Sequence, residues 1–325
     1  MKILVVIIPA YNEEEGIGQV LDRMPKQVDG IDRLKVVVIN DGSTDHTAAV
    51  AREKGAEVIS HPSNQGLGVA FRNGIERALE KGADIIVNID ADGQFDPEDI
   101  PQLVAPILKD EAEVVTASRF LSPELKPKMS RIKAAGNKFM SAFISKIVKE
   151  KYYDVSCGFR AYSKDAALKM NLFGKFTYTQ ESFIDLAAKN VPIKEVPIRV
   201  KGERLFGKSK IASNLFKYGF NTTRIILSAF RDYKPLRLMT FIGMGFLAVG
   251  IPVGVFFALH YFRTGSFRPH TWAAVLSFAC FVLALFMIVV GVILEMFSRM
   301  RIIQEQLIYL AKRERYEARK AEDAP

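Results

Sequence analysis

The stretch Ile85-Ile86-Val87-Asn88-Ile89-Asp90-Ala91-Asp92-Gly93-Gln94 decides the fold of this chain. Its first five residues are largely apolar and of strand length, which predicts a buried strand. Two carboxylates with one residue between them, Asp90 and Asp92, leave the end of that strand, and Gln94 adds a carbonyl oxygen. Such oxygen ligands suit Mg²⁺ or Mn²⁺, which usually shares them with phosphate oxygens. The stretch therefore predicts a metal–diphosphate site formed by Asp90, Asp92 and Gln94.

An isolated Asp-x-Asp pair is common in surface turns, so its place in the fold decides its interpretation. Apolar runs at Ile3 to Ile8 and at Leu34 to Ile39 also have strand length, and helical spacing separates the runs. Apolar strands alternating with helices indicate a parallel sheet covered on both faces, with ligands at the carboxyl ends of the strands. One aspartate would bind the metal there, and the other would bind the metal or the ribose of a nucleotide.

A polar motif, Pro9-Ala10-Tyr11-Asn12-Glu13-Glu14, follows the first predicted strand. Tyr11 can face a nucleotide base, and Glu13 can accept a hydrogen bond from a base or a ribose. The alternative is an ordinary helix start, with Asn12 as its cap and acidic residues in its first turn.

A second polar motif, Asn40-Asp41-Gly42-Ser43-Thr44-Asp45, follows the second predicted strand. A capped helix turn accounts for the residues from Ser43 to Asp45. It does not account for an aspartate at the end of an apolar strand, where Asp41 can hold the base or the ribose.

The three motifs together, at these separations, resemble glycosyltransferase family 2. The resemblance implies an α/β GT-A (nucleotide-diphospho-sugar transferase) domain over residues 1–210, with Asp92 and Gln94 among its catalytic residues. It also implies a basic loop, including Arg204 and Lys210, that closes over the diphosphate. The donor-binding residues that we expect on these grounds are Pro9, Tyr11, Asn12, Glu13, Asp41, Asp90, Ala91, Asp92, Arg204 and Lys210.

More narrowly, the chain resembles the polyprenyl-phosphate glycosyltransferases, such as dolichol-phosphate mannose synthase and undecaprenyl-phosphate glucosyltransferase. Ala117-Ser118-Arg119-Phe120, Cys157-Gly158-Phe159-Arg160 and Gln180-Glu181 fit that group. The resemblance implies that Arg119 and Arg131 hold the acceptor phosphate, near Asn137. A phosphate monoester does need cationic, forked donors. For Arg131 a solvated helix face is an equal alternative.

Two apolar segments near the C-terminus predict a membrane hairpin over residues 238–296. Leu238 to Phe262 and Trp272 to Leu294 each exceed the roughly 20 residues that cross a bilayer. Residues 211–237 predict amphipathic helices in the membrane interface, and residues 297–325 predict a basic tail. Lys and Arg crowd both ends of the hairpin, which predicts that the catalytic domain and the tail face the cytoplasm.

Composition and missing motifs exclude several classes. The net charge of +9 indicates an anionic partner. No basic stripe interleaved with aromatics stands out, so we expect a membrane surface and no nucleic acid. The Gln-x-x-Arg-Trp motif of processive synthases is absent, because the sole tryptophan is Trp272. The four histidines have no metal-ligand spacing. We expect them at the surface or the membrane interface; they are His46, His61, His260 and His270.

The sequence thus predicts a metal-dependent transfer of one hexose from a UDP- or GDP-sugar to a polyprenyl phosphate, dolichyl or undecaprenyl. The resemblance implies that the transfer is inverting at the anomeric carbon. Two alternatives stay open. The chain could be a membrane-anchored transferase for a soluble glycan or protein, or a non-catalytic scaffold that binds a nucleotide sugar. The interfacial helices and the charged tail could also support a homo-oligomer.

Overall fold

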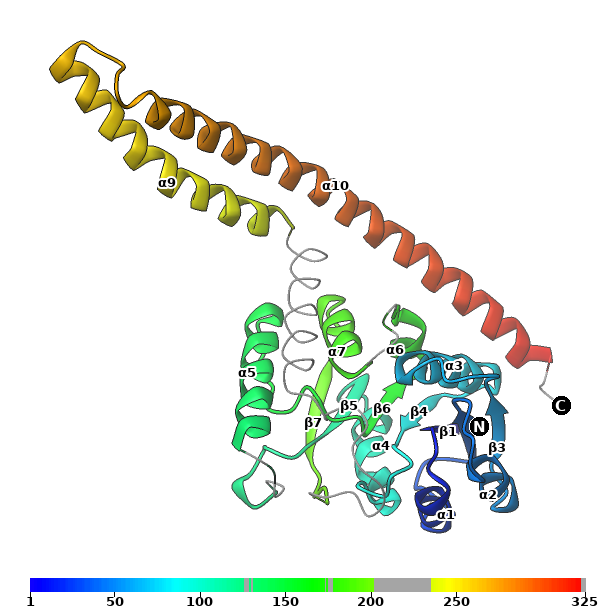
Figure 1. Ribbon diagram of the computed structural model, residues 1–325. Coiled ribbons are helices and arrows are strands. Elements are labelled where there is room, and N and C mark those ends of the chain that lie inside the picture. Colours follow the sequence, from blue (N-terminus) through cyan, green and yellow to red (C-terminus); the bar gives the residue numbers. More distant parts are fainter. Residues whose placement is uncertain (126–128, 130, 173, 175–177, 202–234, 323–325) are drawn as a thin grey trace. The chain divides into compact units, whose positions relative to one another are not determined.

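The structure of the chain is a computed structural model, shown in Figure 1. It describes residues 1–125, 129, 131–172, 174, 178–201 and 235–322, without the side chains of residues 123, 131–133, 147 and 319–322. The chain divides into two compact units. The first comprises Met1–Asn214 with Ile308–Pro325, and the second comprises Leu215–Leu307.

Within its described residues, the first unit contains a seven-stranded sheet with the order β3-β2-β1-β4-β6-β5-β7. The strands are β1 (Ile3–Ala10), β2 (Arg33–Asn40), β3 (Glu57–Ser60), β4 (Ile85–Asn88), β5 (Val114–Ser118), β6 (Arg160–Ser163) and β7 (Ile193–Pro197). All neighbouring pairs are parallel except those of β6, which runs antiparallel to β4 and to β5. The carboxyl ends of β1, β2, β4 and β5 therefore share one edge with the start of β6.

The predicted parallel arrangement is confirmed for β1, β2 and β4, and β6 adds an antiparallel strand that the sequence analysis did not predict. This strand is four residues long, and its apolar pattern carries no information about direction. The chain reaches it from the segment ending in Gly158 and Phe159, which already lies at the carboxyl edge. Asn88, the last residue of β4, is the partner of Arg160, the first residue of β6. The direction of β6 thus brings the residues that precede it next to the end of β4.

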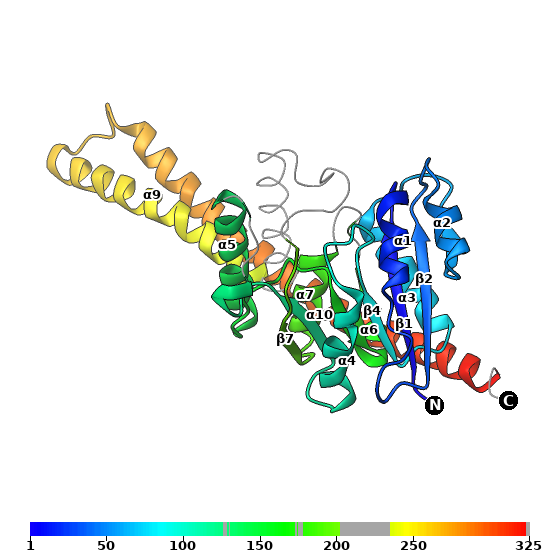
Figure 2. The same ribbon diagram turned by 90° about the horizontal axis from the view of Figure 1, so that it is seen from below.

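Helices cover both faces of the sheet (Figures 1 and 2). Alternate residues of β1 point to opposite faces, as the period of a strand requires. Leu4, Val6 and Ile8 pack with α1 and α4, whereas Val5 and Ile7 pack with α3 and α6. The helical segments of this unit are α1 (Glu14–Asp22), α2 (Thr47–Glu53), α3 (Leu67–Glu80), η1 (Pro97–Asp99), α4 (Ile100–Leu108), η2 (Pro123–Leu125), α5 (Arg131–Val148), α6 (Lys164–Lys169) and α7 (Thr179–Ala188).

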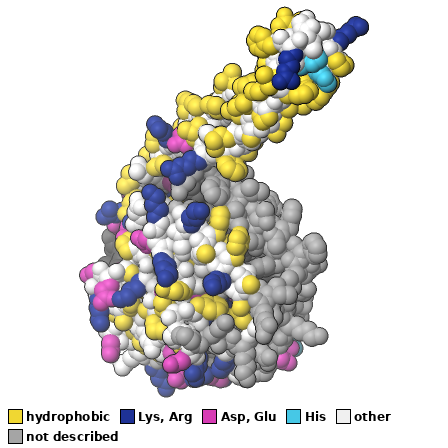
Figure 3. All heavy atoms as spheres, turned by 90° about the vertical axis from the view of Figure 1, so that its left-hand side faces the viewer, with side chains coloured by type: hydrophobic (Ala, Val, Ile, Leu, Met, Phe, Trp, Pro, Cys, Tyr) yellow, Lys and Arg dark blue, Asp and Glu magenta, His cyan; other side chains and the backbone are white. Residues whose placement is uncertain are grey.

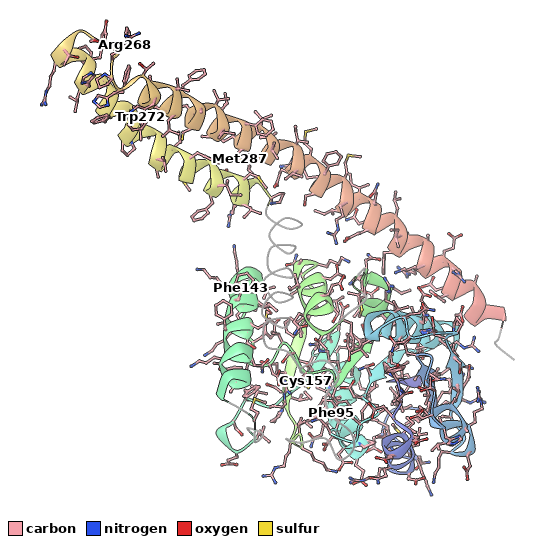
Figure 4. The ribbon with its side chains drawn as sticks, in the orientation of Figure 1. Phe95, Phe143, Cys157, Arg268, Trp272 and Met287 are labelled. Atoms are coloured by element: carbon pink, nitrogen blue, oxygen red, sulfur yellow. The ribbon has the colours of Figure 1, made fainter. Side chains whose placement is uncertain are left out.

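The second unit contains two long apolar helices that pack together. They are α9 (Pro235–Thr264) and the first part of α10 (Thr271–Glu322), joined by a turn near which Figure 4 places Arg268 and Trp272. Among the described residues, these two helices are long and apolar enough to cross a membrane. Large apolar side chains such as Phe241 and Phe278 are each 71% exposed. These features suggest membrane association.

Small residues form the contact between the two helices. The hydroxyl of Ser277 on α10 donates to the carbonyl of Gly250 on α9 at 2.9 Å. A Cβ added at Gly250 would lie 2.7 Å from the Cβ of Cys280. Small residues at such contacts allow close backbone approach, which is typical of helix packing in membranes.

The last part of α10 belongs to the first unit. Tyr316 is buried in the core beside α3 and α6. The Tyr309 hydroxyl donates to Asp165 at 2.6 Å, and the Lys312 ammonium donates to the carbonyl oxygen of Met170 at 3.1 Å. The segment predicted as a basic tail is thus helical as far as Glu322, in agreement with its content of strong helix formers. Residues 211–234 of the predicted interfacial helices lie outside the described residues.

Candidate active site

The first two polar motifs form one interlocked surface at the carboxyl edge of the sheet. The backbone N–H of Asn12 donates to the Ser43 hydroxyl at 2.9 Å, and the Asn12 side-chain oxygen accepts from the N–H of Thr44 at 2.8 Å. The N–H of Glu13 donates to the Thr47 hydroxyl at 2.9 Å. Asn12 therefore holds the neighbouring loop and does not cap α1. The predicted donor residues Tyr11, Asn12 and Glu13 are all partly exposed on this surface.

Asp41 is buried, and its carboxylate holds the loop between β3 and α3. One oxygen accepts from the N–H of Gln65 at 2.9 Å and lies 2.7 Å from Nδ1 of His61. The other accepts from the N–H of Gly66 at 2.9 Å. Binding of a base or ribose by Asp41 would add to these bonds. In the structure Asp41 positions the loop Gln65-Gly66 at the end of β2.

His61 is one of the site residues that sequence reasoning missed. The expectation of a surface or interfacial position is wrong here, because His61 is 9% exposed. Its Nε2 lies 2.8 Å from the side-chain nitrogen of Asn73, which can only donate. Nδ1 then carries the proton and donates to Asp41. His61 directly follows β3, which ends at Ser60, and this position was its only local signal.

The turn after β4 brings the predicted metal ligands Asp90, Asp92 and Gln94 together. Asp92 is 3% exposed, and its carboxylate accepts from the N–H of Gln94 at 3.1 Å. The carbonyl of Gln94 in turn accepts from the N–H of Lys201 at 3.0 Å. Ala91 is buried between the two aspartates. The segment that ends at Lys201 thus packs against the turn.

These residues fit a hard divalent cation that is shared with a phosphate ligand. No group of three or more His, Cys, Asp and Glu side chains gathers as a metal site within the described part of the chain. Mg²⁺ in nucleotide sites is commonly bound by one or two carboxylates, with phosphate oxygens and water completing the shell. Asp90 and Asp92 supply two carboxylates, and Gln94 supplies a neutral oxygen donor.

The Tyr178 hydroxyl lies near Asp90, at the end of β4. The Asn88 side-chain amide donates to the Tyr178 hydroxyl at 2.6 Å and to the carbonyl of Gly158 at 2.9 Å. A Cβ at Gly158 would lie 2.8 Å from the Tyr178 hydroxyl and 3.3 Å from an oxygen of Asp90. Burial, followed by the negative charge of Asp90, raises the pKa of Tyr178 well above its ordinary value. The Tyr178 hydroxyl therefore stays protonated.

Arg119 and Asn137, two predicted acceptor-phosphate residues, meet in one polar network around Asp154. Arg119 binds Asp154 through two nitrogens, Nε at 2.6 Å and Nη2 at 2.8 Å. Nη2 also donates to the Ser156 hydroxyl at 3.0 Å, and the Asn137 amide donates to Asp154 at 3.4 Å. Sequence reasoning missed Asp154 and Ser156. They lie in the segment before β6, and only the folding of that segment places them beside Arg119.

Asp154 is fully buried, and its charge depends on Arg119. Burial alone would raise the pKa of Asp154, but the hydrogen bonds and charge of Arg119 outweigh burial and lower it below its ordinary value. A guanidinium has five N–H donors. The bonds to Asp154 and Ser156 use three of them, so these two residues orient Arg119 without exhausting it.

Three predicted site residues have side chains outside the described residues. The backbone of Arg131 begins α5, but its side chain lies outside the described residues, as do Arg204 and Lys210. Glu181, which fits the polyprenyl-phosphate group of the family, is described: both of its carboxylate oxygens accept from the N–H of Gly174, at 3.1 and 3.0 Å.

The mixed sheet, the two interlocked loops and the acidic turn define a glycosyltransferase of the GT-A type. Glucosyl-3-phosphoglycerate synthase from Mycobacterium tuberculosis, solved with Mn²⁺ and uridine-diphosphate-glucose, has the same fold. It superposes with a TM-score of 0.53 over 70% of this chain and 78% of that chain, at 24% sequence identity. Residues 5–170 match the family described as Glycosyl transferase family 2. The chain belongs to this family.

Relatives of known activity are similar over more than half of the chain. UDP-N-acetylglucosamine–dolichyl-phosphate N-acetylglucosaminyltransferase from Methanococcus voltae is 35% identical, over 61% of this chain and 85% of its own length. Undecaprenyl-phosphate 4-deoxy-4-formamido-L-arabinose transferase from Shewanella sediminis is 29% identical, over 78% of this chain and 74% of its own length.

Proposed function

We propose that this glycosyltransferase transfers one hexose from a nucleoside diphosphate sugar to a polyprenyl phosphate in the membrane, with inversion at the anomeric carbon. The observation that carries the proposal is the presence, in one chain, of the Asp90 and Asp92 turn and two apolar helices of membrane-spanning length. The acceptors named for the two relatives above, dolichyl and undecaprenyl phosphate, support the same acceptor class.

The donor would lie across the carboxyl ends of β1, β2 and β4. Its base and ribose would contact Tyr11, Glu13 and the Asp41 loop. Its diphosphate would lie at the turn that carries Asp90, Asp92 and Gln94. These three residues would hold Mg²⁺ or Mn²⁺, which when bound neutralises the charge that develops on the leaving diphosphate.

The acceptor phosphate would approach from the side of Arg119. A phosphate oxygen is already ionised at neutral pH, so the site needs positioning and charge neutralisation more than a general base. Asp154 and Ser156 hold the Arg119 guanidinium in one orientation and leave donors for a second anion. Because Asp154 balances the charge of Arg119, Arg131 would supply the net positive charge.

The membrane arrangement is part of the proposal. The two apolar helices would span the bilayer as a hairpin. The catalytic domain and the C-terminal end of α10 would then both lie on the cytoplasmic side, since Lys and Arg gather at both ends of the hairpin.

The test uses the full chain, purified in detergent. It is incubated with polyprenyl phosphate, Mg²⁺ or Mn²⁺ and a panel of UDP- and GDP-sugars, and lipid products are detected by mass. We expect one polyprenyl-phosphate hexose, its loss with a chelator and in Asp92→Ala, and its retention in the surface control Asp29→Ala. Transfer only to soluble glycans or proteins in a parallel arm, or donor binding without any product, would refute the proposal.

A further inference from the structure

Glu195 lies on β7, next to β5, and its side chain binds two consecutive backbone amides. One carboxylate oxygen accepts from the N–H of Tyr153 at 2.9 Å, and the other accepts from the N–H of Asp154 at 2.8 Å. Glu195 lies beyond residues 5–170, which match the family, and no step of the proposed transfer uses it. The role of this carboxylate is therefore open.

Asp154 connects Glu195 to Arg119. Glu195 holds the backbone of Asp154, and the carboxylate of Asp154 accepts from Nε and Nη2 of Arg119 at 2.6 and 2.8 Å. The sheet makes a second connection, because Glu195 is the partner of Thr116 in β5, and Arg119 directly follows that strand. The position of the Arg119 guanidinium thus depends on the backbone that Glu195 holds.

Only an ionised glutamate can accept from both amides in this way. A carboxylate has two acceptor oxygens, whereas a protonated carboxyl carries an O–H donor on one oxygen, and a glutamine carries an NH₂ group in that place. The surroundings nevertheless disfavour the charge. Burial raises the pKa of Glu195 above its ordinary value, the two N–H bonds oppose this effect, and the negative charge of Asp154 adds to it. A carboxylate at this position fits a requirement for two acceptors.

The charge of Glu195 is not part of an acidic surface. Figure 3 views the side of the molecule on which α5 lies, and the acidic side chains that it shows are dispersed among Lys and Arg. Lys194, the preceding residue on β7, pairs with Glu111. The titratable groups whose charges interact with Glu195 are Asp154 and Tyr152, both from the segment before β6. Glu195 therefore acts on that segment.

We propose that Glu195 is a positioning residue for the acceptor site. Its ionised carboxylate holds the backbone at Tyr153 and Asp154, and this backbone directs Arg119 toward the acceptor phosphate. When Glu195 gains a proton, one of the two amides loses its acceptor, and Arg119 is held less firmly. The effect on the acceptor rests on the proposed function, whereas the hold on the two amides does not.

The first test measures the hold by hydrogen exchange of the full chain in detergent, with mass spectrometry of a peptide that contains Tyr153 and Asp154. In Glu195→Gln this peptide should exchange about tenfold faster, while a peptide from β1 should be unchanged. Glu111→Gln is the matched control, because it breaks the exposed pair with Lys194 and leaves Glu195 in place.

The wild type alone offers the same test if the variant does not fold. Its protection at Tyr153 and Asp154, corrected for the intrinsic exchange rate, should fall as the pH is lowered from 8 to 5, because Glu195 then becomes neutral. Protection that is the same in Glu195→Gln, or that does not change over this pH range, would overturn the proposal.

The second test measures KM for polyprenyl phosphate and for the donor. At pH 8 Glu195→Gln should raise the acceptor KM by about tenfold and leave the donor KM unchanged, and Glu111→Gln should change neither. The ratio of the acceptor KM in Glu195→Gln to that in the wild type should fall as the pH is lowered to 5, since the wild-type carboxyl also becomes neutral. Ionisation of the acceptor phosphate cancels in this ratio.

Two kinetic results would overturn the positioning role: a ratio that is constant from pH 8 to 5, or an equal rise in the donor KM. A protein with no lipid-phosphate activity at all would refute the proposed function and with it the effect on the acceptor. Hydrogen exchange would still report the hold on Tyr153 and Asp154, so the two failures can be told apart.

Discussion

Gly16 lies against the carbonyl oxygen of Ala91 so closely that a Cβ added at residue 16 would be 2.5 Å from that oxygen. Gly16 belongs to the first turn of α1, and Ala91 separates the two aspartates of the proposed metal site. Helix α1 thus packs directly on the turn after β4. Only glycine allows this approach, because real Cβ atoms are not found so close to a backbone oxygen.

Gly16→Ala should therefore displace the turn that carries Asp90 and Asp92. Inserting a methyl group into a packed contact costs about 1–3 kcal/mol. The displacement should lower kcat, because a misplacement of 1 Å in a site can cost on the order of 100-fold. Hexose transfer and thermal unfolding measured on the same preparation test this prediction.

Gly18→Ala is the matched control on the same helix. A Cβ there would lie 3.4 Å from the nearest atom, a side-chain carbon of Val50, which is ordinary contact. Alanine also favours a helix over glycine by about 1 kcal/mol. Gly18→Ala should therefore be as active as the wild type and no less stable. Equal activity of both variants would show that α1 does not support the turn.

The strand ends were predictable because each combines a local apolar run with the polar residue that follows it. Asp41 and Asp90 belong to such sequence-local patterns, so the sequence placed them at one edge of a sheet. Asp154 and Tyr178 do not belong to such a pattern. Asp154 lies in the segment before β6, Tyr178 lies directly before α7, and only the tertiary fold brings these segments to the site. Their positions depend on β6 running antiparallel, which no residue pattern in β6 records.

The sequence also did not reveal which side chains pair with Arg119 and His61 in the buried part of the site. Arg119 was expected to meet a phosphate, but it also needs a partner for its burial, and Asp154 provides one. His61 was expected at the surface, but it is buried because Asp41 and Asn73 satisfy both ring nitrogens. Such pairings are contacts between distant residues, and a single sequence contains no direct signal of them.

Asp154→Asn should strongly destabilise the first unit. The variant leaves the Arg119 guanidinium, whose side chain is only 18% exposed, without a negative partner. Breaking a buried ion pair by removing one partner costs about 3–5 kcal/mol. Thermal unfolding at pH 7, followed by circular dichroism, should show the loss, and Asp29→Ala should unfold like the wild type. A wild-type transition temperature for Asp154→Asn would mean that Arg119 finds another partner.

The stability gap between the wild type and Asp154→Asn should depend on pH. The folded-state pKa of Asp154 lies below its ordinary value, because Arg119 outweighs the effect of burial. The ion pair is then fully present above the unfolded-state pKa, about 3.9 for an aspartate. Its contribution is lost as the pH falls through the lower folded-state pKa. The gap should thus be constant from pH 5 to 7 and narrow only in strong acid. A gap that already narrows between pH 7 and 5 would contradict the lowered pKa.

Gly42→Ala should disrupt donor binding through the loop that Asp41 holds. Gly42 has a φ of 71°, and a Cβ there would lie 2.4 Å from the backbone carbon of Ser63. Gly55→Ala is the matched control, since Gly55 has a φ of 80° but nothing within 4 Å of the added Cβ. Both variants place an alanine in the left-handed backbone conformation, which lowers the free energy of unfolding by about 1–2 kcal/mol. Only Gly42→Ala should also weaken binding of UDP- or GDP-sugars, measured by calorimetry, and equal affinities would contradict the role of this loop.

Gly250→Ala should separate the two apolar helices of the second unit. The added Cβ would lie 2.7 Å from the Cβ of Cys280, where neither backbone can yield without moving its helix. Helix association in membranes depends on close packing of this kind, so the variant should lower the unfolding temperature in detergent. Gly245→Ala on the same helix is the matched control, because a Cβ there meets nothing within 4 Å. Transfer to polyprenyl phosphate should fall in Gly250→Ala alone if the hairpin must stay closed. Equal unfolding temperatures would show instead that the Gly250 contact does not hold the two helices together.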